Sequence, residues 1–458
     1  MRKVLRFIVL FIFCFFSSNA KAYDFSALNL EGVEIFYNIL SQNEISVVSG
    51  DTKYNVTSLV IPDSVFYNNI NYKVVMIAEN ALASYPDLRE LYIPASVVNI
   101  ATSHYVESLL GEADKFESFN VSETNPRYFS HEGVLYDGTA LLKCPTQKQG
   151  EYEIKEGTTL IGSRAFANSQ LSTISMPNSV GWMMSHTFFC ASVEKISLSN
   201  KLGQIPNNAF EGCLDLNYLK IPDSVYSIGD SVFMDCGSLG ELVVPASVKR
   251  IGTDAFEGCY WYDQFLFSGG PIYIGSVLYE FIHDLNISSF YVKSGIKEIH
   301  EYAFLDNLEI EELIFPATLE FIGRGAFERC YNLLEISCLA SEPPYIESYT
   351  TFWYLPKDMP IHIPVGSLQA YQSAPYWSEF TNFIEDDFVS IKKNFVDEIK
   401  FRVVDGMLEI DSYNGEVKIF TISGQLIKSM VVNESTNIYL PKGTYIIVSD
   451  NARSKVVI

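Results

Sequence analysis

Hydrophobic and polar positions recur along the chain in one pattern. It reads Leu-x-x-Leu-x-Ile-Pro, a short polar loop, and then Val-x-x-Ile-Gly-x-x-Ala-Phe-x-x-Cys. Its clearest copy runs from Leu216 through Leu219, Ile221 and Pro222 to Cys236. With the residue before the proline as an anchor, twelve copies fall at positions 61, 93, 121, 154, 176, 198, 221, 244, 292, 315, 338 and 363. The commonest spacing is 22 to 23 residues, so the chain is built from a short repeated unit.

A unit of this length cannot bury its own apolar face, and therefore successive units must stack. Alternation along a strand places Leu219 and Ile221 inward and Lys220 outward, and the proline ends the strand because it cannot donate to the sheet. The glycines at 162, 229, 252 and 323 suit a turn with positive φ. The period lies within the ~20 to 29 residues of leucine-rich repeats. The pattern predicts a mainly β leucine-rich repeat solenoid of about twelve coils.

Three longer spacings indicate insertions. The first contains the alternating run 71–77, which predicts an extra strand. The second contains Asp137-Gly138 between two apolar runs, a favoured two-residue hairpin turn. The third holds an aromatic-rich segment from Trp261 to Phe281, in which Gly275-Ser276-Val277-Leu278-Tyr279 repeats the hairpin motif. We expect these hairpins to project from one edge of the solenoid.

These residues resemble the BspA-type leucine-rich repeat proteins, which are mostly secreted or surface proteins of bacteria. The resemblance covers about residues 30–385, including the entry segment 32–39 and the exit segment 363–367 with Tyr371, Trp377 and Phe380. It implies a surface protein used in adhesion or partner binding. We expect a host or bacterial surface protein as the partner, and the aromatic residues described below suggest a glycan as the alternative. The resemblance carries no catalytic motif.

After residue 400 the repeat gives way to short alternating strands, such as 417–420 and 445–448, with turn signals at Asp405-Gly406, Asn414-Gly415, Ser423-Gly424 and 441–443. This pattern predicts a small β-sandwich over 401–458. Residues 417–426, 443–447 and 455–458 resemble the C-terminal sorting domain of type IX secretion substrates. That resemblance implies recognition by export machinery in the outer membrane; a plain structural end-domain is the alternative.

The first 22 residues have the parts of a secretory signal peptide. Basic residues precede the apolar run 7–16, and the segment ends in Ala20-Lys21-Ala22. We therefore expect a signal peptide at 1–22, an N-terminal cap at 23–55, the solenoid at 56–385, a linker at 386–400 and the end-domain at 401–458. No later segment is apolar enough to span a bilayer. The expected location is secreted or at the cell surface, anchored at the outer membrane.

Charge excludes one class of partner. The 458 residues carry 32 basic and 55 acidic side chains, a formal charge of −23. Nucleic-acid affinity depends on cationic side chains that release counterions from phosphates, so a nucleic-acid partner is not expected.

Cysteine spacing suggests a column. Cys190, Cys213, Cys236 and Cys259 are each 23 residues apart, which predicts one angular position on four successive coils. Buried free thiols are the leading interpretation, while one or two disulfides or a metal site remain alternatives. Zinc-type Cys-x-x-Cys pairs are missing, and we expect no cofactor and no metal.

Binding candidates come from the alternation of side chains. The candidate contacts on the outward sheet face are Tyr92, Lys220, Val243, Tyr291, Ile314 and His362. The candidate contacts in the third insertion are Trp261, Tyr262 and Tyr273. For the aromatic residues of the third insertion and for Tyr345, Tyr349, Phe352, Trp353 and Tyr354, local hydrophobic cores are the favoured explanation and ligand contacts are the alternative. The histidines are scattered and no nucleophile motif is present, so we expect binding rather than catalysis, with carbohydrate binding as the alternative to protein binding.

Overall fold

The computed structural model describes residues 23–101, 115–266, 269–282, 287–388, 400–404, 407–421, 426–449 and 453–457. The predicted signal peptide and most of the predicted linker lie outside these ranges. The chain divides into two compact units, residues 1–138 and 139–458. Among the described residues, no helix combines the length and the apolar character needed to cross a membrane.

The first unit combines a mixed sheet with the first coils of the repeat. Its mixed sheet contains β1 (Phe25–Leu28), β2 (Glu34–Ile39), β3 (Glu44–Val48), β5 (Ser64–Tyr67), β6 (Ile70–Ile77) and β8 (Asn99–Ile100). A parallel row is formed by β4 (Ser58–Val60), β7 (Glu90–Ile93) and β9 (Ser118–Val121), and an antiparallel hairpin by β10 (Tyr128–His131) and β11 (Val134–Asp137). The extra strand predicted over 71–77 is confirmed as β6.

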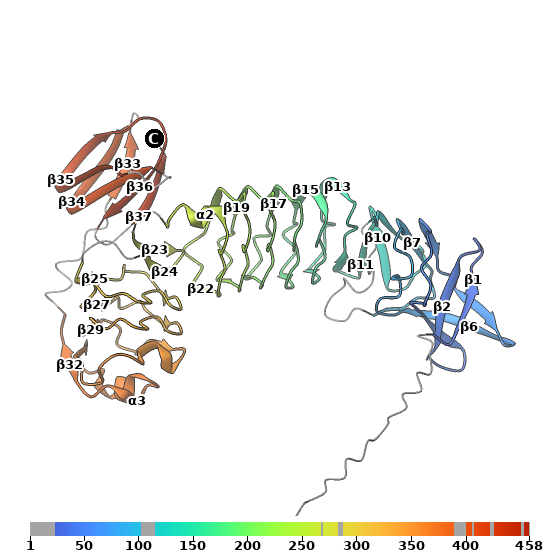
Figure 1. Cartoon of the computed structure of the whole chain (residues 1–458), viewed down its shortest axis with the longest axis horizontal. Helices are drawn as coiled ribbons and strands as arrows, with labels where there is room; N and C mark the ends of the chain where they lie inside the picture. The colour runs from blue at the N-terminus through green and yellow to red at the C-terminus, as the bar shows by residue number, and fades with distance from the viewer. Residues whose placement is uncertain are drawn as a thin grey trace, which may run out of the picture. The chain divides into compact units, whose positions relative to one another are not determined.

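The first half of the second unit is a two-walled solenoid whose strands stack as parallel rungs (Figure 1). One wall consists of β13 (Gln149–Glu153), β15 (Gln170–Ser175), β17 (Lys195–Ser197), β19 (Tyr218–Lys220) and β21 (Glu241–Val243). The other consists of β12 (Ala140–Lys143), β14 (Leu160–Ile161), β16 (Trp182–Met183), β18 (Gln204–Ile205), β20 (Ser227–Ile228) and β22 (Arg250–Ile251).

The second half repeats this arrangement. One wall consists of β25 (Ser289–Tyr291), β27 (Glu312–Phe315), β29 (Glu335–Cys338), β31 (Ile361–Pro364) and β32 (Phe383–Asp386). The other consists of β23 (Gly270–Ile274), β24 (Val277–Ile282), β26 (Glu298–Ile299), β28 (Phe321–Ile322) and β30 (Tyr345–Ile346). The short helices are α2 (Tyr260–Asp263), η1 (Tyr349–Phe352), α3 (Leu368–Ser373) and η2 (Trp377–Glu379).

The strand positions predicted from the repeat are confirmed. Eleven of the twelve anchors are the last residue of a strand or directly follow one, and Ile363 is the residue before the last in β31. The strand β32 lies beyond the last anchor. Leu219 and Ile221 are fully buried, whereas Lys220 is exposed. The apolar positions of the repeat therefore face the interior between the two walls.

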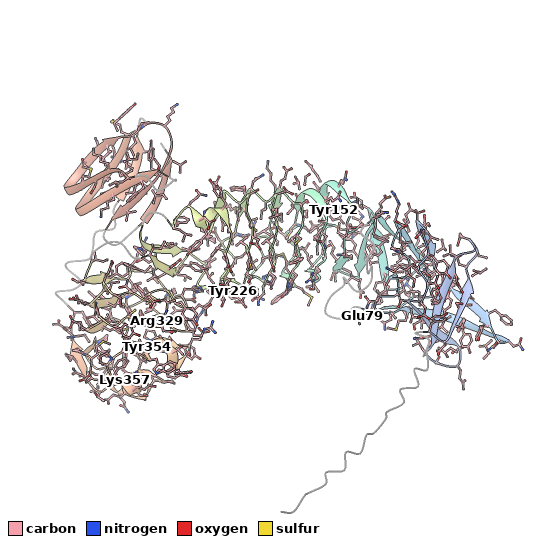
Figure 2. All side chains as sticks on the ribbon, viewed as in Figure 1. Glu79, Tyr152, Tyr226, Arg329, Tyr354 and Lys357 are labelled. Carbon is pink, nitrogen blue, oxygen red and sulfur yellow. The ribbon has the colours of Figure 1, made fainter. Side chains whose placement is uncertain are left out.

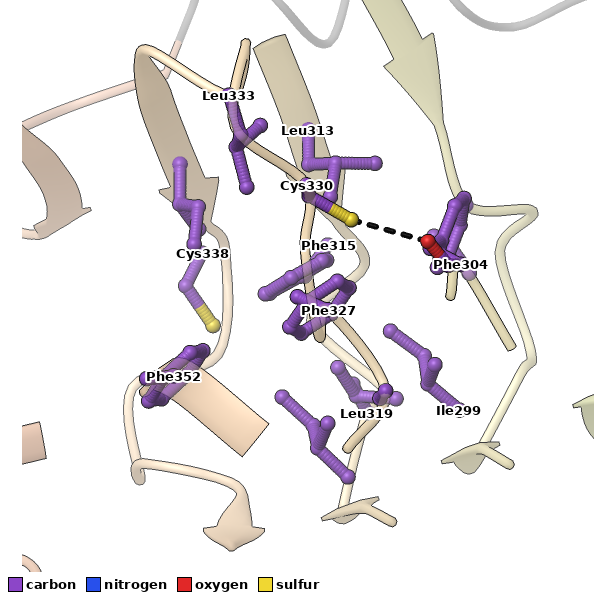
Figure 3. Packing of buried hydrophobic residues seen from close by; sticks show 14 of the residues in the cluster. Ile299, Phe304, Leu313, Phe315, Leu319, Phe327, Cys330, Leu333, Cys338 and Phe352 are labelled. Carbon is purple, nitrogen blue, oxygen red and sulfur yellow. Dashed lines mark hydrogen bonds between the residues drawn. The ribbon is translucent and has the colours of Figure 1, made fainter. Parts of the chain in front are cut away.

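Phenylalanine rings form the centre of this interior. In the second half, Phe281, Phe304, Phe327 and Phe352 stack in succession, with ring centroids 5.2, 5.6 and 5.9 Å apart. Figure 3 shows part of this core, where Leu313, Phe315 and Leu319 surround the rings. Each coil thus buries its apolar side chains against the next coil.

The repeated glycines serve a different purpose from the one predicted. Gly162, Gly229, Gly252 and Gly323 are not among the glycines with positive φ. A Cβ at Gly229 would lie 2.6 Å from the backbone nitrogen of Asn207, and one at Gly252 would lie 2.4 Å from that of Asp230. The prediction of positive φ is therefore wrong: these positions lack a side chain because the neighbouring coil approaches too closely.

The third insertion is a hairpin, but it does not project. β23 and β24 pair antiparallel around Gly275-Ser276, and β24 then pairs in parallel with β26. Ile272, Val277 and Leu278 are buried because the hairpin continues the wall of the solenoid. The expectation of a projecting hairpin is wrong here, since its apolar residues face the common core.

The C-terminal residues form an antiparallel β-structure of β33 (Lys400–Val404), β34 (Met407–Thr421), β35 (Leu426–Tyr439), β36 (Thr444–Ser449) and β37 (Arg453–Val457). The start of β34 pairs with β33 and its end pairs with β36, around a core that includes Leu408, Ile419 and Ile447. Asn414-Gly415 lies inside β34, so the turn predicted there is wrong: β35 pairs with both residues and extends the strand. The turns predicted at 405–406 and 423–424 lie outside the described residues.

Candidate binding sites of the solenoid

The sheet of the first half carries a mixed outward face. In register, Glu151, Thr173, Lys195, Tyr218 and Glu241 form one row across β13–β21. A second row, two residues further along the strands, contains Lys220 and Val243, which are both exposed. We call these two rows the mixed sheet face. It contains acidic, basic, aromatic and aliphatic side chains at the spacing of neighbouring strands.

The other predicted sheet positions differ in exposure. Tyr92, in the first unit, is 40% exposed, and its hydroxyl donates to Glu90 at 3.0 Å. Tyr291 is half-buried, and burial raises the pKa of its phenol. Ile314 is 2% exposed, so its expected accessibility is wrong; it lies in register between the half-buried Tyr291 and the buried Ser337 of the neighbouring strands.

His362 is held between two carboxylates. Its Nε2 lies 3.6 Å from Glu335 and its Nδ1 lies 3.7 Å from Asp386. These acids belong to the strands on either side, β29 and β32. The ring is 23% exposed and reaches solvent at one edge.

The aromatic residues predicted as insertion contacts are mainly core. Trp261 and Tyr262 are each 9% exposed and pack against Phe256. The hydroxyl of Tyr273 accepts a hydrogen bond from the backbone N–H of Lys293 at 3.2 Å. Their expected role as exposed contacts is wrong for Trp261 and Tyr262, because α2 folds them onto the last coil before the hairpin. Tyr262 keeps one polar contact, since its hydroxyl donates to Glu280.

Tyr262 also borders a cavity of about 410 Å³ between the coil that ends at Cys259 and the coil that contains β26. Aromatic and acidic side chains line it together, and we call it the acidic cavity. Its lining includes Tyr262, Tyr279, Tyr302 and His300 among the rings, and Asp254, Glu257, Glu280 and Glu301 among the acids. The cavity therefore has a negative electrostatic potential.

Tyr279 lies among the acidic side chains of this cavity. Burial raises the pKa of its phenol strongly, and the nearby charges of Glu280, Asp254, Glu301 and Glu257 raise it further. The ring is 8% exposed and stacks on His300, with centroids 4.5 Å apart and planes at 17°. The phenol is consequently protonated at neutral pH and is available as both donor and acceptor.

Arg250 lines a smaller hollow that shares Thr253, His300 and Glu301 with this cavity. The guanidinium carbon of Arg250 lies 3.3 Å from the ring centroid of Phe321, and Nη1 donates to Glu298 at 3.0 Å. Glu298 is 3% exposed and also lies 3.5 Å from Nδ1 of His300. An arginine here is held by a carboxylate and an aromatic face together.

The cysteine column exists, but Cys190 is not part of it. Sγ of Cys213 donates to the carbonyl of Phe188 at 3.0 Å, and Sγ of Cys236 donates to that of Phe210 at 3.1 Å. Cys330 repeats the contact with Phe304 at 3.0 Å (Figure 3). The seven described cysteines are free thiols, and Cys190 is exposed while the others are buried.

The expected place of Cys190 in the column is wrong. Ala191, which is 1% exposed, occupies the buried position, and its N–H bonds to Phe188 as that of Cys213 bonds to Phe210. Cys190 instead lies against Gly212, at a turn position with φ of 53°. The coil at this point is one residue shorter than the next, so a constant spacing of 23 shifts the register by one.

A second exposed feature combines Tyr331 with three residues for which a local core is predicted, Tyr349, Trp353 and Tyr354. Tyr331, Tyr349, Trp353 and Tyr354 are 58%, 58%, 57% and 42% exposed. Trp353 stacks on Tyr354 with centroids 5.6 Å apart, and Tyr331 and Tyr349 contact these two rings. Figure 2 labels Tyr354 on the last coils of the solenoid. We call these four residues the aromatic cluster; of the aromatic residues predicted at 345–354, Phe352 alone is core.

Comparison with known families supports the assignment of the repeat. Residues 144–263 and 273–354 match the family described as BspA type leucine rich repeat region, in six copies. The matched residues are similar to BspA-type repeats, in agreement with the leucine-rich repeat solenoid of the fold. The match includes β13–β21, the acidic cavity and all four residues of the aromatic cluster.

Solved structures show similar chains at low identity. A leucine-rich repeat protein from Bacteroides ovatus is 18% identical, with 80% of this chain and all (100%) of that chain covered and a TM-score of 0.40. A leucine rich cell surface protein from Faecalibacterium prausnitzii is 17% identical, with 82% and 98% covered and a TM-score of 0.27. The pneumococcal vaccine antigen PcpA is 13% identical, with 80% and 99% covered and a TM-score of 0.27. No curated protein matches the sequence.

Sequence reasoning missed the acidic cavity. Its acids come from the coil that ends at Cys259, from β24 of the hairpin and from the coil that contains β26, so no local motif contains them together. One signal was present: Glu257, Glu280 and Glu301 each lie next to or near an aromatic residue in the irregular region of the repeat. The aromatic-rich insertion was recognised, but not the acidic side chains that accompany it.

Proposed function

We propose that this protein is exported, is held at the cell surface and acts by binding another protein rather than by catalysis. The observation that carries the proposal is the mixed sheet face. A face with Lys195, Tyr218, Lys220 and Glu241 on adjacent strands suits a protein partner, because protein interfaces combine aromatic contacts with complementary charge.

The test is an array of matrix and cell-surface proteins probed with the full chain. A double charge reversal on this face, Lys195→Glu with Lys220→Glu, is expected to weaken binding to a protein hit at least tenfold, since like charges then oppose each other. Reversal of two charges away from the face, Lys293→Glu with Lys297→Glu, is the matched control. Equal binding by all three forms would contradict the role of the mixed sheet face.

A carbohydrate ligand is the second candidate, and the aromatic cluster favours it. Exposed Trp353 and Tyr354 offer flat apolar faces with polar edges, which suit the faces of sugar rings. On a glycan array, Trp353→Ala is expected to abolish a glycan signal, while Trp182→Ala, which removes another exposed indole, is expected to preserve it. A glycan signal that survives Trp353→Ala would contradict this candidate.

Export is proposed from the features of residues 1–22 and from the resemblance of 401–458 to a sorting domain. Fractionation of the producing cells, followed by the intact mass of the surface form, tests both. We expect a surface form that begins near residue 23 and lacks the residues after about 401. Surface material that retains Ile458 would contradict removal of a sorting domain.

A further inference from the structure

We propose that the acidic cavity binds the guanidinium group of an arginine side chain on the partner protein. This inference rests on the proposed function, because it names the chemistry by which a protein partner is recognised. It concerns a site separate from the mixed sheet face.

The first support is uncompensated charge. Asp254, Glu257 and Glu280 line the cavity, and no basic side chain in the described part of the chain forms an ion pair with them. Glu301 is the exception, since it accepts from Arg324 at 2.7 Å. Three carboxylates therefore remain for an external cation, and a cation that enters gains attraction in a partly enclosed space where water screens charge less.

The second support is an unsatisfied hydroxyl. The side chain of Tyr279 is more than nine-tenths buried, and its hydroxyl has no hydrogen-bond partner among the described residues. It faces the cavity among the same carboxylates. The Tyr279 oxygen is not among the fully buried unpaired atoms of the described residues, so it reaches the open space of the cavity, where a ligand can donate to it or accept from it.

The shape of the acid cluster favours an organic cation over a metal ion. Within the described ranges, no three His, Cys, Asp or Glu side chains converge closely enough to hold a metal. A guanidinium group is larger and planar and has five N–H donors, so it can reach carboxylates on several sides together with the Tyr279 hydroxyl.

The chain supplies two precedents at the rim. Arg250 is bound by Glu298 and the face of Phe321, and Arg324 is bound by Glu301 with its guanidinium carbon 5.4 Å from the ring centroid of Tyr302. Both use one carboxylate and one aromatic ring. The acidic cavity offers the same two kinds of group without a resident arginine.

The experiment uses the full chain and four probes: a short Gly-Ser peptide with one arginine, the same peptide with lysine, the same peptide with citrulline, and agmatine as a free guanidinium compound. Calorimetry or saturation-transfer NMR measures the affinity of the chain for each probe at low and at high salt. We expect the arginine peptide to bind, lysine to bind more weakly, citrulline not to bind, and affinity to fall with salt.

Variants locate the site. Glu257→Gln and Tyr279→Phe are each expected to weaken binding of the arginine peptide about tenfold, the loss of one charge-assisted hydrogen bond. Glu194→Gln is the matched control, because Glu194 is an exposed acid of the same solenoid away from the cavity. Circular dichroism and thermal melting establish that each variant is folded.

Each outcome decides the inference. Binding that Glu257→Gln and Tyr279→Phe leave unchanged, or citrulline binding as well as arginine, would overturn it. Agmatine binding without peptide binding would overturn the inference that the guanidinium group belongs to a partner protein, and would indicate a small-molecule ligand. If the arginine peptide does not bind while the array still gives a protein partner, the inference fails and the proposed function stands; if the array gives no partner, the proposed function fails.

Discussion

The phenyl rings of Phe210 and Phe233 lie parallel on successive coils, with centroids 5.5 Å apart and planes at 2°. The backbone N–H of Phe210 also bonds to the carbonyl of Val232 in the next coil at 3.0 Å. Stacking and backbone pairing thus hold the same two coils together. This relationship repeats from Phe166 to Phe256, so the interior is a continuous column of rings.

Removal of one ring from this column is expected to destabilise the solenoid. Phe210→Ala leaves a cavity between Phe188 and Phe233 and should lower the unfolding free energy by about 3–5 kcal/mol. Urea unfolding followed by circular dichroism measures the change. Trp182→Ala, at a site 63% exposed, should change it by less than about 1 kcal/mol. Similar losses in both variants would contradict the role of the ring column.

The close approach of coils at Gly229 predicts a steric effect. Gly229→Ala places a methyl group against the backbone of Asn207 and should cost about 1–3 kcal/mol of stability. Gly237→Ala is the matched control, because a Cβ there meets nothing within 4 Å and φ is not positive. Thermal melting compares the two. A stable Gly229→Ala protein would show that neighbouring coils can separate locally without cost.

The change of register at Cys190 predicts selective labelling. In the native protein without residues 1–22, a maleimide should modify Cys190 rapidly and leave the six buried thiols unmodified. Intact mass should show one added label, and Cys190→Ala should show none. In urea, the unaltered chain should take up seven labels. Rapid labelling of Cys213 in the native state would contradict the buried column.

The buried thiols also predict a pH dependence of stability. Burial raises the pKa of Cys259 to about 11 from its ordinary value of 9.0. The unfolded chain releases this proton more easily than the folded chain, so the contribution to stability is complete below pH 9 and is lost as pH rises towards 11.

Urea unfolding at pH 8 and at pH 10.5 measures this loss. Cys259→Ala should reduce the difference between the two pH values. Cys190→Ala should leave it as in the unaltered chain, since that thiol is already exposed. An equal difference in all three proteins would assign the effect to other groups.

The contact between Arg250 and Glu298 predicts a penalty for an unpaired acid. Arg250→Met leaves the buried carboxylate of Glu298 without its cation and should cost about 3 kcal/mol. The double variant Arg250→Met with Glu298→Gln should recover part of the loss, because the glutamine is neutral. Denaturation of both variants provides the measurement. No recovery would indicate that packing of Arg250 on Phe321, rather than charge, dominates.

Several features of this fold could be predicted from the sequence because they depend on local alternation. Leu219, Lys220 and Ile221 reveal which side chains face inward, and the proline marks where the strand ends. The same reasoning gave the extra strand β6 and the hairpin of β23 and β24. It was wrong for Cys190, because a change of one residue in coil length shifts every later position, and a fixed spacing does not show where that change lies.

The sequence by itself determined the stacked repeat and its strand positions, because each coil carries the same short pattern and buries it against the next. The tertiary structure alone decided which side chains are accessible. It buried Ile314 and Trp261, exposed Trp353 and Tyr354, and gathered Asp254, Glu257, Glu280 and Glu301 around Tyr279. The reason is physical: exposure and local charge depend on neighbours from other coils, whereas strand alternation depends on adjacent residues.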